Sequence, residues 1–143
     1  MPHIPRLATA FFALVLFAQP RVADANLLVN GSFELGTPAG TYTTLPLGST
    51  DITGWMVTRT DVDIVGTYWA SQDGVRSIDL DGLNPGCLAQ TFSTVSGAVY
   101  MVSFYLAGNP CAPVPTRMRV SAAGQSADFS FDVTGRTLSD MGW

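Results

Sequence analysis

The sequence predicts an all-β fold, a β-sandwich of the jelly-roll type, for the part of the chain that follows an apolar N-terminal leader. Short segments alternate apolar and polar residues with a period of two, which is typical of strands with one buried face. The 14 glycines and 9 prolines among 143 residues separate these segments with turn-forming clusters. Beyond the leader, no stretch keeps apolar residues at helical spacing over three turns. Together these patterns favour a sandwich of many short strands.

Two segments show the alternation most clearly. Apolar residues at positions 129, 131 and 133 alternate with polar ones, and Met118 and Val120 alternate with arginines and serine. The segment 99–107 is apolar on both faces, which predicts a central strand covered on each side. Shorter strands are expected at 26–34, 52–58, 62–65, 75–80 and 87–92.

The leader predicts export. An apolar run at 7–18 follows Arg6, and small residues flank the expected cleavage after Ala25, so residues 1–25 are interpreted as a signal peptide helix and residues 26–143 as one domain. The run is too short to cross a bilayer of roughly 30 Å, and no membrane span is expected in the mature chain. We therefore expect a secreted, extracellular or cell-surface protein.

The composition of the mature chain excludes several classes of function. The mature chain contains no histidine, because His3 lies in the leader. This excludes Ser-His-Asp and Cys-His catalysis and the usual imidazole zinc sites. Five arginines, no lysine and ten acidic residues give a formal net charge of −5, which argues against nucleic-acid binding. No catalytic residue is predicted.

The two cysteines of an exported chain are expected to form one disulfide. If residues 96–97 turn the chain, Cys87 and Cys111 fall near the same end of an antiparallel pair. Two buried free thiols are the alternative.

An ordered set of motifs resembles a known family. The set is Asn26–Glu34, Gly54-Trp55, Asp73–Gly82, Gln90–Phe92, Tyr100–Phe104 with Gly108-Asn109-Pro110, and Met141-Gly142-Trp143. Together these residues resemble the domain-of-unknown-function 642, or choice-of-anchor C, family. The resemblance implies a galactose-binding-like jelly roll, found in plant cell-wall and exported bacterial proteins, that associates with wall polysaccharide. Members typically continue past Met-Gly-Trp, so the domain is expected to be incomplete at its C-terminus.

Glu34 is the candidate metal ligand. In similar sandwiches the Phe-Glu of the first strand helps to hold a structural calcium, and a carboxylate beside backbone carbonyls suits this hard cation. A solvated carboxylate, or one paired with an arginine, is the alternative. Asp79 and Asp81 share a strand face, where solvation or pairing with Arg76 is favoured over a metal.

Sugar binding needs flat aromatic faces and planar polar side chains. The residues of the right type are Trp55, Tyr68, Trp69, Gln90 and Asn109. A core position is the alternative for both tryptophans, and the Gln90 amide is either buried and satisfied or exposed in a groove.

The sequence thus predicts a non-catalytic exported β-sandwich that associates weakly with extracellular or cell-wall polysaccharide. The principal alternative is a structural or adhesive surface domain with no small ligand. A glycoside hydrolase using Glu34 with an aspartate is less favoured, because such enzymes need a carboxylate pair facing each other across a cleft.

Overall fold

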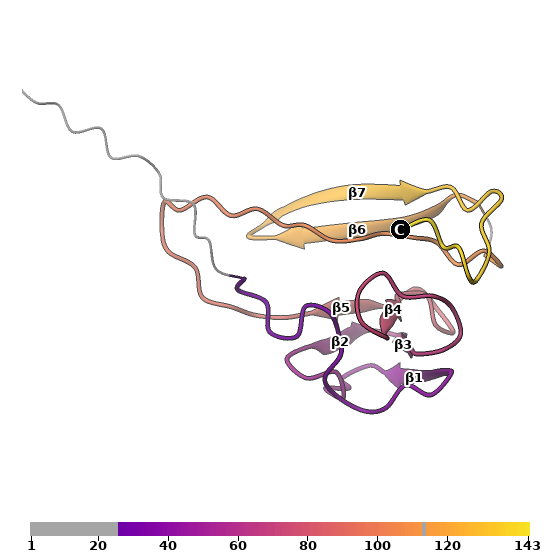
Figure 1. Ribbon diagram of the computed structural model, residues 1–143. Helices are drawn as coiled ribbons and strands as arrows, with labels where there is room; N and C mark the ends of the chain where they lie inside the picture. Colours follow the sequence, from indigo (N-terminus) through magenta and orange to yellow (C-terminus); the bar gives the residue numbers. More distant parts are fainter. Residues whose placement is uncertain (1–25, 113) are drawn as a thin grey trace, which may run out of the picture.

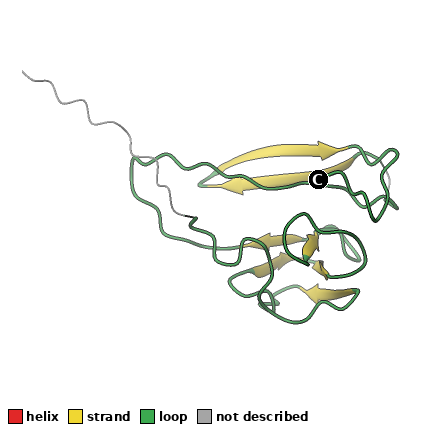
Figure 2. Cartoon of the chain, in the orientation of Figure 1, coloured by secondary structure: helices red, strands yellow, loops and turns green. Residues whose placement is uncertain are grey.

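The computed structural model describes residues 26–112 and 114–143, which form an all-β structure without a helix (Figures 1 and 2). The predicted signal peptide helix lies outside these residues. In chain order the strands are β1 Tyr42–Pro46, β2 Met56–Arg59, β3 Asp61–Val65, β4 Ser77–Asp79, β5 Cys87–Ala89, β6 Thr116–Ala122 and β7 Gln125–Phe131. Within the described ranges, no helix has the length and apolarity needed to cross a membrane.

The strands form three antiparallel sheets that do not close on one another. β3 is the central strand of the first sheet, in the order β1-β3-β4, and pairs Thr44 with Asp63 and Asp63 with Asp79. β2 pairs with β5, and β6 with β7. In Figure 1 the long β6–β7 hairpin lies on one side of the molecule and the five shorter strands lie on the other.

Alternation along β3 determines which face is buried. Val62 and Ile64 are 0% exposed, whereas Asp61 and Asp63 are half-buried on the other face. The larger hydrophobic cluster combines the buried residues Ala39, Leu45, Ile52, Val57, Val62 and Ile64. A second cluster joins Val65 and Trp69 to Met141, so the last residues of the chain pack onto the end of β3.

The β6–β7 hairpin places strands at the two segments that were predicted most clearly, but β7 ends at Phe131, before Val133, and residues 125–130 are exposed rather than alternately buried. Its two-residue turn, Ala123-Gly124, has φ values of +49° and +77°, as hairpin turns that match the twist of the strands require. Met118 is half-buried while Arg119 is exposed and forms an ion pair with Asp128 at 2.6 Å.

Most of the other strand predictions are partly or wholly wrong. β3 covers the whole of the predicted segment 62–65, whereas β4 and β5 occupy only parts of theirs, and β2 begins four residues later than predicted and ends at Arg59. β1 has no counterpart among the predicted strands, because Tyr-Thr-Thr-Leu-Pro has a single buried residue. Residues 26–34 form a turn rather than a strand, because Asn30 and Phe33 adopt φ values of +54° and +62°.

The segment 99–107 is not the predicted central strand. It has no strand partner among the described residues, and Met101 is 88% exposed. A strand that is apolar on both faces needs other elements packed against both faces. Here the aromatic contact is a T-shaped pair between Phe104 and Phe129, with ring centroids 5.0 Å apart.

The predicted disulfide is not formed. Cys87 and Cys111 are both free and exposed, so the alternative of buried thiols does not describe them either. The prediction required β5 to pair with a strand at 99–107, and β5 pairs with β2 instead. Nothing in the observed strand order therefore brings the two cysteines to one end of a pair.

Candidate functional site

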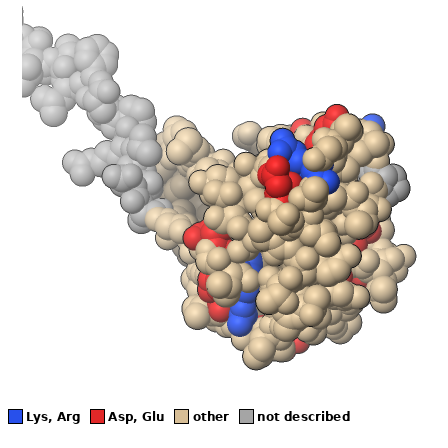
Figure 3. All heavy atoms as spheres, turned by 45° about the vertical axis from the view of Figure 1, so that its right-hand side comes forward, with Lys and Arg blue, Asp and Glu red and all other residues tan. Residues whose placement is uncertain are grey.

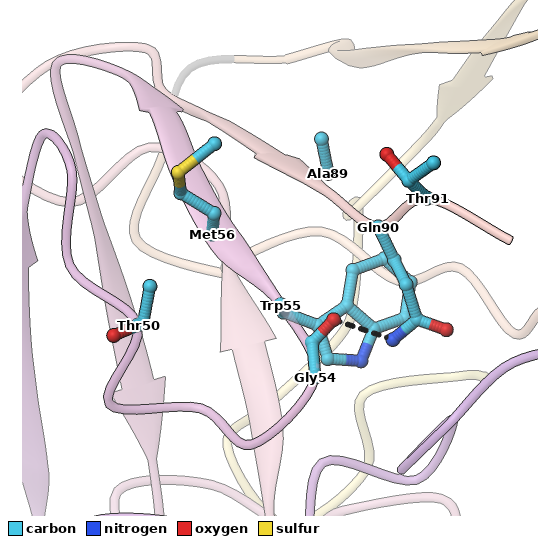
Figure 4. Close-up of a pocket in the computed structure, with 7 residues that line it drawn as sticks. All are labelled: Thr50, Gly54, Trp55, Met56, Ala89, Gln90 and Thr91. Atoms are coloured by element: carbon cyan, nitrogen blue, oxygen red, sulfur yellow. Dashed lines mark hydrogen bonds between the residues drawn. The ribbon is translucent and has the colours of Figure 1, made fainter.

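An open depression lies at one end of the β2–β5 pair and has a volume of about 280 Å³. We call it the Trp55 depression, and Figure 4 shows the residues that line it. They are Thr50, Gly54, Trp55, Met56, Ala89, Gln90 and Thr91. Thr50, Met56 and Thr91 are exposed at this surface. Two of the five predicted sugar-contact residues, Trp55 and Gln90, thus meet here.

The Gln90 side chain joins three segments of chain. Its Nε2 donates to the carbonyl of Val29 at 2.9 Å and to that of Gly54 at 2.7 Å, and its Oε1 accepts the Val29 amide at 2.7 Å. The bond to Gly54 is the dashed line in Figure 4. Because both amide hydrogens are used, Gln90 forms a rigid floor of the depression and has no N–H left to donate to a ligand.

Trp55 is half-buried and held at both ends. Its indole Nε1 donates to the Asn30 carbonyl at 3.1 Å, and its ring lies 5.3 Å from that of Phe33 at an angle of 49°. The same ring contacts the larger hydrophobic cluster and lines the depression. Trp55 therefore serves as core and as part of an accessible surface.

Asn30 joins three segments beside the depression and was not among the predicted site residues. Its Nδ2 donates to the carbonyls of Leu35 at 2.9 Å and Thr53 at 3.0 Å, and its Oδ1 accepts the Leu35 amide at 3.0 Å. The Asn-Gly pair was the available signal, because asparagine tolerates the left-handed conformation that this turn requires.

The predicted aromatic pair Tyr68-Trp69 lies in the second hydrophobic cluster, apart from the Trp55 depression. Trp69 is buried, with 7% exposure, and its Nε1 donates to the Ser77 hydroxyl at 2.7 Å. The half-buried Tyr68 ring contacts Trp69 and the exposed Tyr42 edge-on, at 5.6 and 5.7 Å. Trp69 is therefore a core residue, and Tyr42 and Tyr68 form the accessible aromatic pair.

Asn109 is also used within the chain. Its Oδ1 accepts the Cys111 amide at 3.0 Å, and its side chain acts to lower the pKa of Asp79. The predicted sugar-contact residues are thus divided among three places.

Glu34 ties two loops together. Its Oε1 accepts the backbone amides of Val75 at 2.8 Å and Arg76 at 2.9 Å. Nearby, the Ser32 hydroxyl donates to Asp73 Oδ2 at 2.6 Å. Glu34 is therefore neither a free, solvated carboxylate nor the partner of an arginine side chain, which were the two alternatives to a metal ligand. Across residues 26–112 and 114–143, no three acidic or thiol side chains are grouped so that they could hold a metal ion.

Burial and neighbouring carboxylates act on Asp79. Burial of the side chain raises its pKa, and the charges of Asp63, directly opposite on β3, and of Asp81 raise it further. The Asp81 amide, which donates to Asp79 Oδ1 at 3.0 Å, and the Asn109 side chain oppose the shift. Pairing with Arg76 is not observed.

We expect Asp79→Asn to stabilise the domain at neutral pH. A carboxyl group whose folded pKa is raised takes up a proton more readily in the folded state, so its charge costs stability above the folded pKa and this cost disappears as the pH falls. Like charges directly opposite across a sheet are destabilising, and removing one should add roughly 0.2–1 kcal/mol. Urea unfolding at pH 7 and at pH 4 measures this, with the larger gain at pH 7.

Asp132→Asn is the control of opposite sign. Hydrogen bonds from the Thr134 hydroxyl and amide lower the pKa of exposed Asp132. Its charge therefore adds stability above the unfolded pKa that is lost in acid. A loss of stability at pH 7 in Asp79→Asn would contradict the assignment.

Comparison with known proteins identifies the chain. The model of the family described as "Protein of unknown function (DUF642)" matches residues 26–143. The chain belongs to the DUF642 family. This assignment confirms the resemblance drawn from the ordered motifs.

A relative of this DUF642 domain is halomucin of Haloquadratum walsbyi. It is 41% identical over 105 residues, which cover 70% of this chain and 1% of halomucin. The chain thus corresponds to a small part of that relative's length. No solved structure matches the chain.

The DUF642 motifs form contacts with one another. The first, Asn26–Glu34, contacts Gly54-Trp55 through Asn30, Asp73–Gly82 through Glu34, and Gln90–Phe92 through Val29. The contacts of Asn30 with Trp55 and of Val29 with Gln90 therefore fix the surface around the Trp55 depression.

Proposed function

We propose that this DUF642 domain is a non-catalytic, exported module that associates weakly with extracellular or cell-wall polysaccharide. The observation that carries the proposal is the Trp55 depression, where a half-buried indole, an exposed methionine and two exposed threonines surround an open surface. Sugar rings bind by stacking apolar C–H faces on aromatic rings and by hydrogen bonds from hydroxyl groups. This surface offers both over a floor that the Gln90 hydrogen bonds hold rigid.

The lining of the depression supports a binding role over a hydrolytic one. No carboxylate lines it, whereas hydrolysis of glycosides ordinarily requires two, placed on either side of the bond that breaks. Glu34, the predicted partner in such a pair, bonds to backbone amides.

The fold and the halomucin match support the proposed domain type and its proposed location outside the cell. An all-β chain with three antiparallel sheets is compatible with a galactose-binding-like β-sandwich, which is the form we propose for the domain. The halomucin match supports a secreted or surface location. Extracellular polysaccharide is the sugar polymer accessible there.

Retention on immobilised cellulose, chitin and pectin tests the proposal. We expect Met56→Glu to reduce retention by about tenfold, equivalent to about 1.4 kcal/mol, because a charge replaces the apolar wall beside Trp55. Met56 is 46% exposed, so the fold should tolerate the change. Leu83→Glu, at a position 80% exposed and outside the depression, makes the same change of charge and should bind like the parent.

Failure of the folded parent domain to bind any of the three polymers would overturn the proposal. It would favour the second candidate, a structural or adhesive surface domain without a small ligand. The internal use of Trp69, Gln90 and Asn109 as hydrogen-bonding residues supports that candidate.

A further inference from the structure

A second depression, of about 240 Å³, lies where the chain leaves β3 and approaches β4. We call it the Arg76 depression. Its lining residues are Pro38, Ala39, Gly40, Gly66, Thr67, Val75 and Arg76. Arg76 is the one charged residue among them. The depression thus combines apolar walls, exposed backbone, a threonine and a guanidinium group.

The Arg76 side chain keeps most of its hydrogen-bonding capacity. Of the five N–H donors of a guanidinium group, the structure shows Nη1 donating to the Thr37 carbonyl at 3.2 Å. The salt bridges of the described chain are Arg119–Asp128 and Arg136–Asp140, and they leave Arg76 without a carboxylate partner. A half-buried cation with free donors is suited to an external anion.

Glu34 fixes the main chain at this position without pairing with the guanidinium group. The Arg76 amide donates to Glu34 Oε1, as does the Val75 amide. The carboxylate is thus used on the backbone of residues 75–76, and the side chain of Arg76 extends from an anchored main chain. Such anchoring lowers the entropic cost of binding a ligand.

The opposite side of the depression is also fixed. The Thr67 amide donates to the Gly40 carbonyl at 3.1 Å, and the amides of Gly66 and Tyr68 donate to the Thr41 carbonyl at 3.0 and 3.2 Å. A Cβ atom on Gly66 would overlap the Gly40 carbonyl oxygen, so the two segments approach as closely as glycine permits. The next residues along each segment are the aromatic pair Tyr42 and Tyr68.

From this geometry we infer that the Arg76 depression binds the carboxylate of a uronate residue in an acidic polysaccharide. The planar guanidinium fork matches a carboxylate through two parallel hydrogen bonds. Because the mature chain carries a net charge of −5, its overall field does not attract anions, so recognition must come from a local cation. The inference rests on the proposed function and gives it a substrate class.

The test compares polygalacturonate with the same polymer fully methyl-esterified, by affinity electrophoresis at low and at physiological salt. The parent domain should bind the free acid about five- to tenfold more tightly than the ester, as expected for one partly exposed Arg–carboxylate pair. Arg76→Gln should remove this difference and its salt dependence while leaving binding to the ester unchanged.

Arg59→Gln is the matched control. Arg59 also donates one hydrogen bond to a backbone carbonyl, that of Gly86 at 3.1 Å, and forms no salt bridge with the described residues. It lies on β2, outside both depressions. This variant should keep the preference of the parent for the free acid.

Each result decides between the two proposals. Equal binding of free acid and ester, or an equal loss in Arg76→Gln and Arg59→Gln, would overturn the uronate site and leave the proposed function standing. Absence of binding to both polymers, together with no retention on cellulose or chitin, would overturn both. Thermal unfolding of each variant establishes that the protein compared is folded.

Discussion

Gly86→Ala should lower the free energy of unfolding by about 3 kcal/mol, the upper part of the range for overpacking in a filled interior. Gly86 is buried directly before β5, and its amide donates to the Leu80 carbonyl at 2.6 Å. A Cβ atom there would overlap the Asp61 carbonyl oxygen and lie 3.0 Å from Val62 Cγ1. Since the overlapping atom belongs to the backbone of β3, the β1-β3-β4 sheet or the segment of Gly86 must move. Urea unfolding followed by tryptophan fluorescence measures the change.

Gly31→Ala is the matched control. Gly31 has an ordinary φ, and the nearest atoms to an added Cβ are Leu28 Cβ at 3.8 Å and Asn26 Nδ2 at 3.9 Å, which is normal contact. This variant should unfold within about 0.5 kcal/mol of the parent, as is usual for surface substitutions. Equal stability of the two alanine variants would contradict the close packing of Gly86 against Asp61 of β3.

Glu34→Ala should cost about 2 kcal/mol. Hydrogen bonds to a charged acceptor contribute about 1.5–3 kcal/mol when buried, and the two that Glu34 accepts are only partly shielded from water. Removing the carboxylate leaves the amides of Val75 and Arg76 without their acceptor, and the Ser32–Asp73 hydrogen bond then remains between these two segments. Glu34→Gln keeps an oxygen at the same place and should retain more than half of the lost stability. Thermal and urea unfolding of both variants measure the difference.

The same pair of variants tests the calcium expectation. Glu34 Oε1 faces two N–H groups, whose partial positive charges would lie beside any cation bound there. We therefore expect EDTA and millimolar calcium to leave the unfolding midpoint of the parent unchanged. A rise with calcium that disappears in Glu34→Gln would instead establish Glu34 as a metal ligand.

Periodicity in the sequence predicted the strands that carry their own signal. Residues 61–64 of β3, β6 and the second half of β7 alternate apolar and polar residues, and strands form at these segments. Strands that depend on their neighbours were harder to predict. β1 buries one residue and is a strand because β3 pairs with it, while 99–107 is apolar throughout and lacks such a partner among the described residues.

The sequence identified which residue types lie at the candidate site more successfully than it identified what each residue does there. Trp55 and Gln90 were identified as polar or aromatic groups suited to sugars, and they do meet at one depression. Their hydrogen bonds to Asn30, Val29 and Gly54 cross up to 61 residues of sequence. No local pattern distinguishes an amide that binds a ligand from one that closes a loop, or a tryptophan of the core from one at the surface, which is why the roles of Gln90 and Trp69 stayed open until the structure was known.

The Asn30 amide has a consequence for chemical modification. Asn30-Gly31-Ser32 satisfies the acceptor pattern for N-linked glycosylation, which replaces one hydrogen of Nδ2 with a sugar. Both hydrogens of that nitrogen are donated to the carbonyls of Leu35 and Thr53. A glycan could therefore be attached only before the turn closes, and its presence would hold apart the two segments that Asn30 joins.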